Sequence, residues 1–148
     1  MRIYVDADAC PVKDEVYRVA ARYGLPVSVV AVGFIRVPSD PMIERVAAGT
    51  AMDAADDWIA QRAGAGDIVV TADIPLAAAV IARGAHALDP RGELYSEANV
   101  RERLAIRNLM QDLRATGTLI DGPAPFGPRE RRLFADHLDH LLTRRRPA

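Results

Sequence analysis

Short runs of β-branched residues alternate with helical patterns over the first part of the chain, and this alternation limits the possible folds more than any other feature. Residues 27–32 read Val-Ser-Val-Val-Ala-Val, a nearly continuous apolar run that is typical of a strand buried on both faces. Residues 3–5 and 67–71 contain similar runs, and each is followed by a segment with helical spacing of its apolar residues. Strands that alternate with helices predict βαβ units and a mainly parallel sheet.

Three helices are predicted around these strands. The first covers residues 12–23, where apolar side chains recur at steps of three and four until Gly24 ends the pattern. Residues 53–63 and 74–83 predict the other two, and Gly84 closes the second of them. Each of these helices is about ten residues long, the length that a βαβ crossover needs.

Two further segments decide how many strands the sheet has. Residues 42–47 are compatible with a short strand or with a turn, and residues 85–88 could add another short strand. The Pro-rich residues 33–41 form a connection. The expected fold class is therefore α/β, with three α/β/α layers around a mainly parallel sheet of four to five strands.

Beyond the last of these strands the sequence predicts only helices, over residues 97–116 and 128–143. Each carries an apolar stripe: Ile106, Leu109, Met110 and Leu113 in the first, and Leu133, Phe134, Leu138, Leu141 and Leu142 in the second. We expect both helices to pack on the sheet within a single domain of residues 1–148, with residues 144–148 as a tail. The Gly/Pro-rich connection 117–127 is either a plain surface link or a mobile flap.

Composition excludes several classes of protein. The longest apolar run, residues 26–35, is far shorter than the roughly 20 residues of a membrane-spanning helix. We therefore expect a cytoplasmic protein with no membrane partner. Cys10 is the only cysteine, which rules out an intramolecular disulfide and a cysteine-rich zinc site, and we expect no disulfide-linked partner. A bound metal would have to be held by oxygen ligands.

The charges are unevenly distributed along the chain. Residues 1–100 carry 9 basic and 14 acidic side chains, whereas residues 101–148 carry 10 basic and 6 acidic ones. This distribution fits a carboxylate-rich site beside a surface that attracts phosphate groups, although the same charges could simply be solvated. Arg101, Arg103 and Arg107 share one side of their predicted helix and have the same two interpretations.

Acidic side chains follow two of the predicted strands at their carboxyl ends. Asp6 and Asp8 come after the first strand, and Asp73 lies two residues past the end of the strand over residues 67–71. In parallel α/β sheets ligands bind beyond the carboxyl ends of the strands, where loops carry functional side chains. If the two strands are neighbours, these carboxylates will lie close together.

A third group of carboxylates lies on one helix face. Asp53, Asp56 and Asp57 fall within an arc of about 100° at the helical rotation per residue. Clustered carboxylates repel one another unless a cation neutralises them, and hard divalent cations prefer oxygen ligands. The pattern therefore predicts a site for Mg²⁺ or Mn²⁺.

Helix capping is the alternative interpretation of several of these aspartates. Asp73 could cap the helix that begins at residue 74, and Asp53 could cap its own helix, with Asp56 and Asp57 favoured in the first turn by the helix dipole. Capping explains at most one residue of the Asp6/Asp8 pair.

Other polar or reactive side chains have a simpler interpretation in packing. Cys10 lies near a helix N-terminus, where the pKa of a thiol can fall, but no His or Asp partner is evident in the sequence. His137 lies on an apolar stripe and is interpreted as a core residue with a satisfied hydrogen bond, although His137 and His140 have a spacing that could bind metal. Trp58 is interpreted as a core residue rather than a base-stacking platform.

Five motifs in this order resemble the bacterial YaiI/YqxD family of uncharacterised proteins, and together they run from about residue 1 to residue 142. They are Asp6-Ala7-Asp8-Ala9-Cys10-Pro11-Val12, Asp53-Ala54-Ala55-Asp56, Thr71-Ala72-Asp73-Ile74-Pro75-Leu76-Ala77, Ala87-Leu88-Asp89-Pro90-Arg91-Gly92-Glu93 and Gly122-Pro123-Ala124-Pro125-Phe126. The resemblance is specific at the level of the family, and it does not by itself supply an activity.

More distantly, the same residues are similar to PIN-like domains, a group rich in metal-dependent ribonucleases. Their pattern is an acidic residue after the first strand, acids on a central helix and Thr-x-Asp after a later strand. This similarity implies Asp6, Asp56 and Asp73 as the core metal ligands and catalytic residues, with Asp8 and Asp53 assisting and Thr71 supporting. Asp57 falls outside the matching motif and ranks lower, as a supporting residue.

The first functional hypothesis is a nuclease, with RNA as its partner and Mg²⁺ or Mn²⁺ as its cofactor. Carboxylate-held ions make a water molecule acidic enough to attack a phosphodiester. Arg91, Arg101 and Arg107 would bind the nucleic-acid backbone. A common arrangement of carboxylates does not prove turnover, so other functions stay open.

Two alternatives remain. A phosphatase of the haloacid dehalogenase type would use Asp6 as its nucleophile and Asp8 as its acid/base, with Thr71 at a strand end, but it also requires a later lysine, and Lys13 is the only lysine in the chain. A non-catalytic RNA- or nucleotide-binding module would keep the acidic pocket for a structural or sensing ion.

Overall fold

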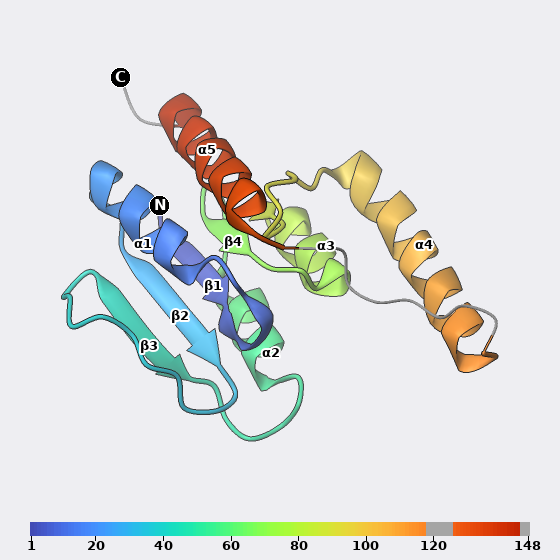
Figure 1. Ribbon diagram of the computed structural model, residues 1–148. Helices are drawn as coiled ribbons and strands as arrows, with labels where there is room; N and C mark the ends of the chain where they lie inside the picture. Colours follow the sequence, from blue (N-terminus) through green and yellow to red (C-terminus); the bar gives the residue numbers. More distant parts are fainter. Residues whose placement is uncertain (118–125, 146–148) are drawn as a thin grey trace.

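The computed structural model describes residues 1–117 and 126–145, and a parallel sheet forms its centre (Figure 1). The strands are β1 (Ile3–Asp6), β2 (Val27–Ala31), β3 (Ile43–Ala47), β4 (Ile68–Val70) and β5 (His86–Leu88). Their order is β3-β2-β1-β4-β5, and every neighbouring pair is parallel. The α/β fold class is confirmed, and residues 43–47 form a strand rather than a turn.

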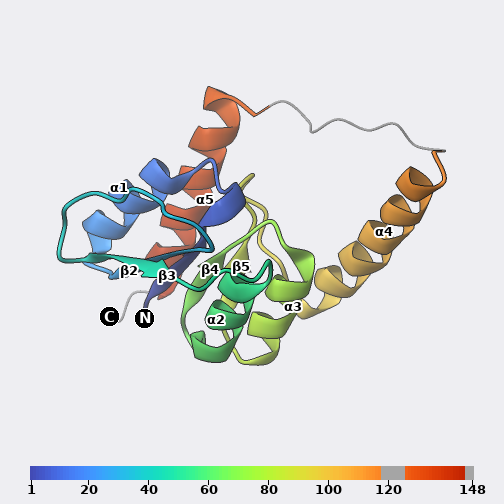
Figure 2. The same ribbon diagram turned by 90° about the horizontal axis from the view of Figure 1, so that it is seen from below.

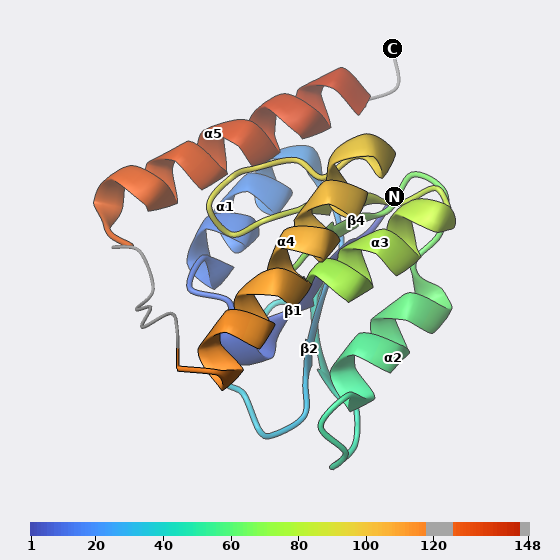
Figure 3. The ribbon, with the colours of Figure 1, turned by 90° about the vertical axis from the view of Figure 1, so that its right-hand side faces the viewer.

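Helices cover both faces of this sheet. On one face lie α1 (Lys13–Tyr23) and α5 (Pro128–Arg145), and on the other lie α2 (Ala54–Arg62) and α3 (Ile74–Ala82), with α4 (Glu97–Ala115) beside α3 (Figures 1 and 3). A short 3-10 turn, η1 (Ala7–Ala9), connects β1 to α1. The predicted three-layer arrangement and the helix positions are confirmed.

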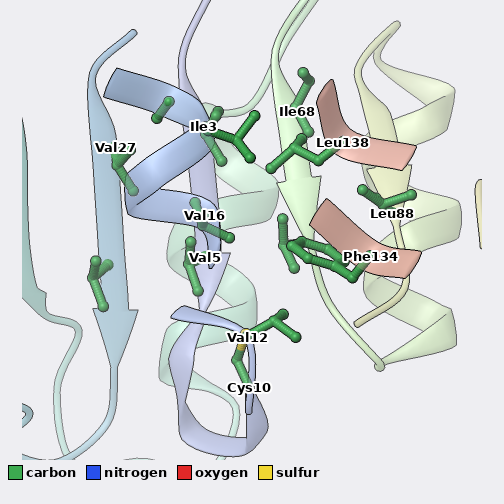
Figure 4. Close-up of a cluster of buried hydrophobic side chains, with 14 of the residues drawn as sticks. Ile3, Val5, Cys10, Val12, Val16, Val27, Ile68, Leu88, Phe134 and Leu138 are labelled. Carbon is green, nitrogen blue, oxygen red and sulfur yellow. The ribbon is translucent and has the colours of Figure 1, made fainter. Parts of the chain in front are cut away.

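Alternating strand residues divide the core into two apolar clusters. Ile3 and Val5 point to the face of α1 and α5, whereas Tyr4 between them points to the face of α2 and α3. Figure 4 shows the first cluster, in which Phe134 and Leu138 of α5 lie over β4 and β5. The clusters bury both faces of the central strands, which explains why their sequences read as continuous apolar runs.

The last helix, α5, ends later than the sequence predicted. The helix α5 extends to Arg145, so residues 144 and 145 belong to it and not to a tail, because the i→i−4 pattern simply continues past Thr143. Most of the connection 117–127, whose role as link or flap was left open, lies outside the described residues.

The apolar stripe of α4 is buried only near its start. Val100 near the start of α4 is buried, but the side chains of Ile106 and Leu109 are 46% and 55% exposed. Figure 2 shows the reason: α4 packs beside α3 with its first turns and then extends away from the body of the molecule. Helical spacing predicts which residues share a face, but it does not predict how far a neighbouring element reaches.

Candidate functional site

The candidate site lies where the strand order reverses, at the carboxyl ends of β1 and β4. These two strands are direct neighbours, with Val5 paired to Val70. Connections leave them in opposite directions across the sheet, to β2 on one side and β5 on the other. Such a switch point leaves an open crevice, which is where parallel α/β sheets bind their ligands. Asp6 ends β1, and Asp73 follows β4, so the topology brings together the two acids that the sequence placed there.

Hydrogen bonds orient the carboxylates at this point. The Thr71 hydroxyl donates to Asp6 Oδ2 at 2.8 Å, and its oxygen accepts from the Asp73 backbone N–H at 2.9 Å. Asp73 Oδ1 in turn accepts from the Leu76 N–H at 2.9 Å and caps α3. The capping interpretation of Asp73 is therefore confirmed, and the same residue lies within the acidic cluster, because a carboxylate has a second oxygen to offer.

The helix α2 contributes the remaining acids. Asp53 occupies the N-cap position, but its side chain makes no capping hydrogen bond, so that interpretation of its side chain is wrong. Burial raises the pKa of Asp56 to about 7, and the carboxylates of Asp6, Asp73 and Asp53 add to this shift. Burial also raises the pKa of Asp6; the Thr71 hydrogen bond opposes this rise, and Asp73 and Asp8 reinforce it. The acids of three elements thus act on one another electrostatically.

A cleft of about 360 Å³ opens beside these acids, between α2, α3 and α4. Its lining residues are Asp53, Asp56, Asp57, Ala60, Asp73, Pro75, Leu76, Ala79 and Arg107. Arg107 is the basic residue in this lining, and it comes from α4, a helix far along the chain. A guanidinium beside a carboxylate cluster can bind an anionic group that approaches the acids.

The other predicted nucleic-acid residues lie elsewhere. Arg91 lies over the ring of Phe126 at 5.3 Å, and Arg131 also lies over this ring at 5.4 Å. Arg101 is exposed near the start of α4. The cleft lining therefore includes one of the three arginines that we associated with the backbone of a nucleic acid.

Asp8 faces away from the cleft toward the end of β2. Its two carboxylate oxygens accept hydrogen bonds from the Val32 N–H at 3.3 and 3.2 Å. This contact ties η1 to the beginning of the β2–β3 connection. The sequence did not identify Val32 as the partner of Asp8, although a backbone N–H group at the end of a buried strand needs an acceptor.

Two of the three side chains that the sequence assigned to packing contact the core, and the third is exposed. Cys10 is buried in the first cluster, and burial raises the pKa of its thiol, so the packing interpretation is confirmed. Trp58 packs edge-on against Tyr4 with ring centroids 6.0 Å apart. His137 lies 2.5 Å from the Gly92 carbonyl oxygen through Nδ1, but it is exposed, and its assignment to the core is wrong. Its ring lies at the edge of the α5 interface, where it contacts the loop that contains Gly92.

Comparison with known proteins supplies the family. The model described as "Uncharacterized BCR, YaiI/YqxD family" matches residues 4–144. The chain belongs to this family. A UPF0178 protein of Rhodopseudomonas palustris (strain BisB18) is 64% identical over 143 residues, which cover 97% of this chain and 92% of the relative. A UPF0178 protein of Nitrobacter winogradskyi is 58% identical over 148 residues, which cover 100% and 94% of the two chains. No solved structure matches.

The acids of this YaiI/YqxD protein suit a hard divalent cation in their chemistry. They are carboxylates drawn from β1, α2 and the start of α3, and the pKa values of Asp6 and Asp56 are raised first by burial and then by the neighbouring carboxylates. Within residues 1–117 and 126–145, no group of three or more His, Cys, Asp or Glu side chains could hold a metal ion as it stands.

Membrane insertion has no support in the part of the chain that the structure describes. Neither of the two long helices there, α4 and α5, nor any shorter one is apolar enough to cross a bilayer.

Proposed function

We propose that this protein is a Mg²⁺- or Mn²⁺-dependent nuclease that hydrolyses RNA phosphodiesters. The observation that supports it is that Asp6, Asp56 and Asp73 are electrostatic neighbours at the switch point of the sheet, beside a cleft whose lining includes Asp56, Asp73 and Arg107. An acidic cluster attracts cations, and an arginine across from it attracts the phosphate that those cations would contact. The two charges side by side fit a phosphodiester better than either a purely cationic or a purely anionic ligand.

Each residue has a distinct task in this proposal. Asp6, Asp56 and Asp73 would hold the ion, and Asp53 of the cleft lining would assist. Asp8 could assist only after leaving the Val32 N–H. A bound divalent cation would polarise the phosphate and acidify water at the site. Thr71 is a positioning residue, because its hydroxyl fixes one oxygen of Asp6.

The cap on α3 has a second consequence for the site. Because Asp73 Oδ1 is held by the Leu76 N–H, the other oxygen of Asp73 is directed by the helix rather than by a free rotamer. Pre-organised ligands bind ions with a smaller loss of side-chain entropy. Arg107 would hold the phosphate through its N–H donors.

The similarity to PIN-like domains supports the same proposal. The acid after the first strand, the acid on a central helix and the Thr-x-Asp motif are Asp6, Asp56 and Thr71-Ala72-Asp73. Residues that are far apart in sequence are electrostatic neighbours in the fold. A nuclease interpretation explains why they come together, whereas helix capping alone explains only Asp73.

The phosphatase alternative fits less well. Lys13, the only lysine of the chain, donates a hydrogen bond from Nζ to the Cys10 carbonyl oxygen at 2.7 Å. Asp8, which would serve as the acid/base, is hydrogen-bonded to the Val32 N–H. Both groups would have to leave these partners to serve Asp6.

The test combines metal binding and cleavage in the same samples. Titration calorimetry with Mn²⁺ and with Mg²⁺ is performed on the wild-type protein and on Asp6→Asn and Asp73→Asn, and each sample is assayed on labelled single-stranded RNA. Asparagine keeps the size of the side chain and can still cap α3 through its amide oxygen. Asp136→Asn on α5 is the matched control, because Asp136 is an exposed aspartate outside the cleft.

Binding and cleavage by the wild type and by Asp136→Asn, with loss of both in the two site variants, is the expected result. Wild-type cleavage in either site variant removes that residue from the mechanism. RNA binding without metal-dependent turnover favours the non-catalytic module, and a phosphoaspartate trapped at Asp6 favours the phosphatase.

A further inference from the structure

An aromatic side chain stands exposed in the connection between β2 and β3. Phe34 is 81% exposed, and among the described residues it is the only aromatic one in the group of large exposed apolar side chains. Large apolar side chains at the surface commonly mark contact sites, and an exposed phenyl ring gains nothing from packing within the fold. The position of Phe34 therefore calls for a partner outside the chain.

The backbone connects Phe34 to the carboxyl edge of the sheet. Val32, two residues earlier, donates its N–H to the carboxylate of Asp8, and Asp8 follows Asp6 by two residues. Two residues span at most about 7 Å. The ring thus belongs to the same edge as the acidic cluster, on the side of β2.

Positive charge accompanies the ring. The guanidinium of Arg45 on β3 lies 4.5 Å from the ring centroid of Phe34 and covers one of its faces. The high exposure of the residue leaves the rest of the ring open to solvent. Arg36 follows two residues later in the same connection and is also exposed. An open aromatic face with arginines nearby in the same part of the chain is complementary to a base and its phosphates.

A separate hollow lies between this connection and α1. The hollow has a volume of about 310 Å³, and its lining residues are Lys13, Asp14, Tyr17, Arg36, Val37 and Pro38. Tyr17 lines the hollow, and its hydroxyl oxygen is buried and has no hydrogen-bond partner among the described residues. A buried hydroxyl without a partner is uncommon in folded proteins and indicates a missing acceptor.

The polar groups of this hollow suit a phosphate. Tyr17 can donate one hydrogen bond, Arg36 several, and Lys13 retains two N–H groups besides the one that is bonded to the Cys10 carbonyl oxygen. The two cations outnumber the single carboxylate, Asp14, so the hollow favours an anion. A phosphate oxygen would satisfy the Tyr17 hydroxyl.

We propose that the β2–β3 connection binds single-stranded nucleic acid, with an unpaired base stacked on Phe34 and a neighbouring phosphate held by Lys13, Arg36 and Tyr17. This inference rests on the proposed function in one respect, since the bound strand would be the substrate of the acidic site. Duplex bases are covered by their neighbours and cannot stack on a side chain. The substrate class is therefore unpaired RNA or DNA.

Fluorescence anisotropy with a labelled twelve-nucleotide oligouridine tests the proposal in EDTA, where binding is separated from cleavage. Base–aromatic stacking is worth enough that Phe34→Ala is expected to weaken binding about 5-fold to 100-fold, whereas Phe34→Trp keeps it. Arg36→Gln is expected to reduce the slope of log affinity against log salt by about 0.7, the value for one phosphate contact of a single strand. Leu133→Ala, an exposed apolar residue of α5, is the control and keeps wild-type affinity.

Two companion measurements separate the outcomes. Binding of a blunt RNA duplex of the same length is expected to be insensitive to Phe34→Ala, and the thermal unfolding midpoint of each variant is expected to match the wild type. The proposal is overturned if Phe34→Ala and the wild type bind the single strand with equal affinity, or if the wild type binds no oligouridine. It is also overturned if Phe34→Ala loses as much affinity for the duplex as for the single strand. If Phe34→Ala loses binding and the wild type shows no Mn²⁺-dependent cleavage, the binding site is supported and the nuclease proposal is refuted. If the wild type and Phe34→Ala cleave RNA equally well, the nuclease proposal is supported and the binding site is refuted.

Discussion

Substitution of Asp56 tests whether the charge of this carboxylate destabilises the folded protein. Burial, followed by the carboxylates of Asp6 and Asp73, raises the pKa of Asp56 from 3.8 to about 7. The folded protein therefore keeps a proton that the unfolded chain releases above about pH 4. For an acid with a raised pKa, the stabilising contribution is complete below the unfolded pKa and is lost as the pH rises through the folded pKa. The sensitive window thus runs from about pH 4 to about pH 7.

The magnitude follows from the shift. A change from 3.8 to about 7 corresponds to at most about 4 kcal/mol. Because Asp56 is only half-buried, screening by water reduces this to about 1–2 kcal/mol. Asp56→Asn is therefore expected to raise the free energy of unfolding by about 1–2 kcal/mol at pH 8 in EDTA and to leave it unchanged at pH 4. Saturating Mn²⁺ is expected to reduce the difference in free energy of unfolding between the variant and the wild type at pH 8, since the bound ion neutralises the Asp56 carboxylate of the wild type.

Urea unfolding followed by circular dichroism at pH 4, 6 and 8 measures this difference directly. The comparison of variant with wild type at each pH cancels the titration of all other groups. Asp136→Asn, an exposed aspartate on α5, removes one charge in the same way and is expected to show no such pH dependence. An Asp56→Asn protein that is less stable than wild type at pH 8 in EDTA would refute the reasoning, because Asp56 would then be stabilised by its neighbours.

Four further predictions concern the core, one turn and the cleft. Phe134→Ala is expected to lower the free energy of unfolding by about 3–5 kcal/mol in urea titration, because the ring is fully buried. Gly92→Ala is expected to lower the thermal unfolding midpoint, since φ is +94° and the added Cβ would lie 2.9 Å from His137 Nδ1. Asp73→Ala is expected to lose about 1 kcal/mol of stability with the cap on α3, whereas Asp73→Asn keeps it in the same urea titration. Arg107→Ala is expected to raise the KM for RNA at an unchanged thermal midpoint, as measured by steady-state cleavage.

Most of the fold was predictable because local patterns and burial agree. The buried runs at β1, β2 and β4 and the helices between them required only the period of the hydrophobic residues. The strand β3 was ambiguous because it is an edge strand with exposed Glu44 and Arg45, so its sequence carries a weaker apolar signal. The stripe of α4 was misjudged because its period is that of a buried helix, while its far half extends beyond α3.

The candidate site was predictable in part. Asp6 and Asp73 follow strand ends in the sequence, and a general rule of parallel sheets places such residues at one edge. The sequence could not show that Asp73 would both cap a helix and face Asp56, nor that Arg107 would line the cleft, because these contacts depend on how helices pack. Phe34 and Tyr17 were not singled out, since exposure and a missing hydrogen-bond partner are properties of the folded chain alone.

The order of apolar and polar residues determined the elements of this protein, its fold class and the strand ends that carry its acids. Those properties depend on neighbours within a few positions, where the period of side chains around a strand or helix is set by backbone geometry. Tertiary structure decided the strand order β3-β2-β1-β4-β5 and which carboxylates lie near Asp56. It also decided how far α4 extends beyond α3 and that the ring of Phe34 is exposed. They depend on which surfaces of distant segments pack together. The packing free energy arises from contacts between elements and not from any single stretch of sequence.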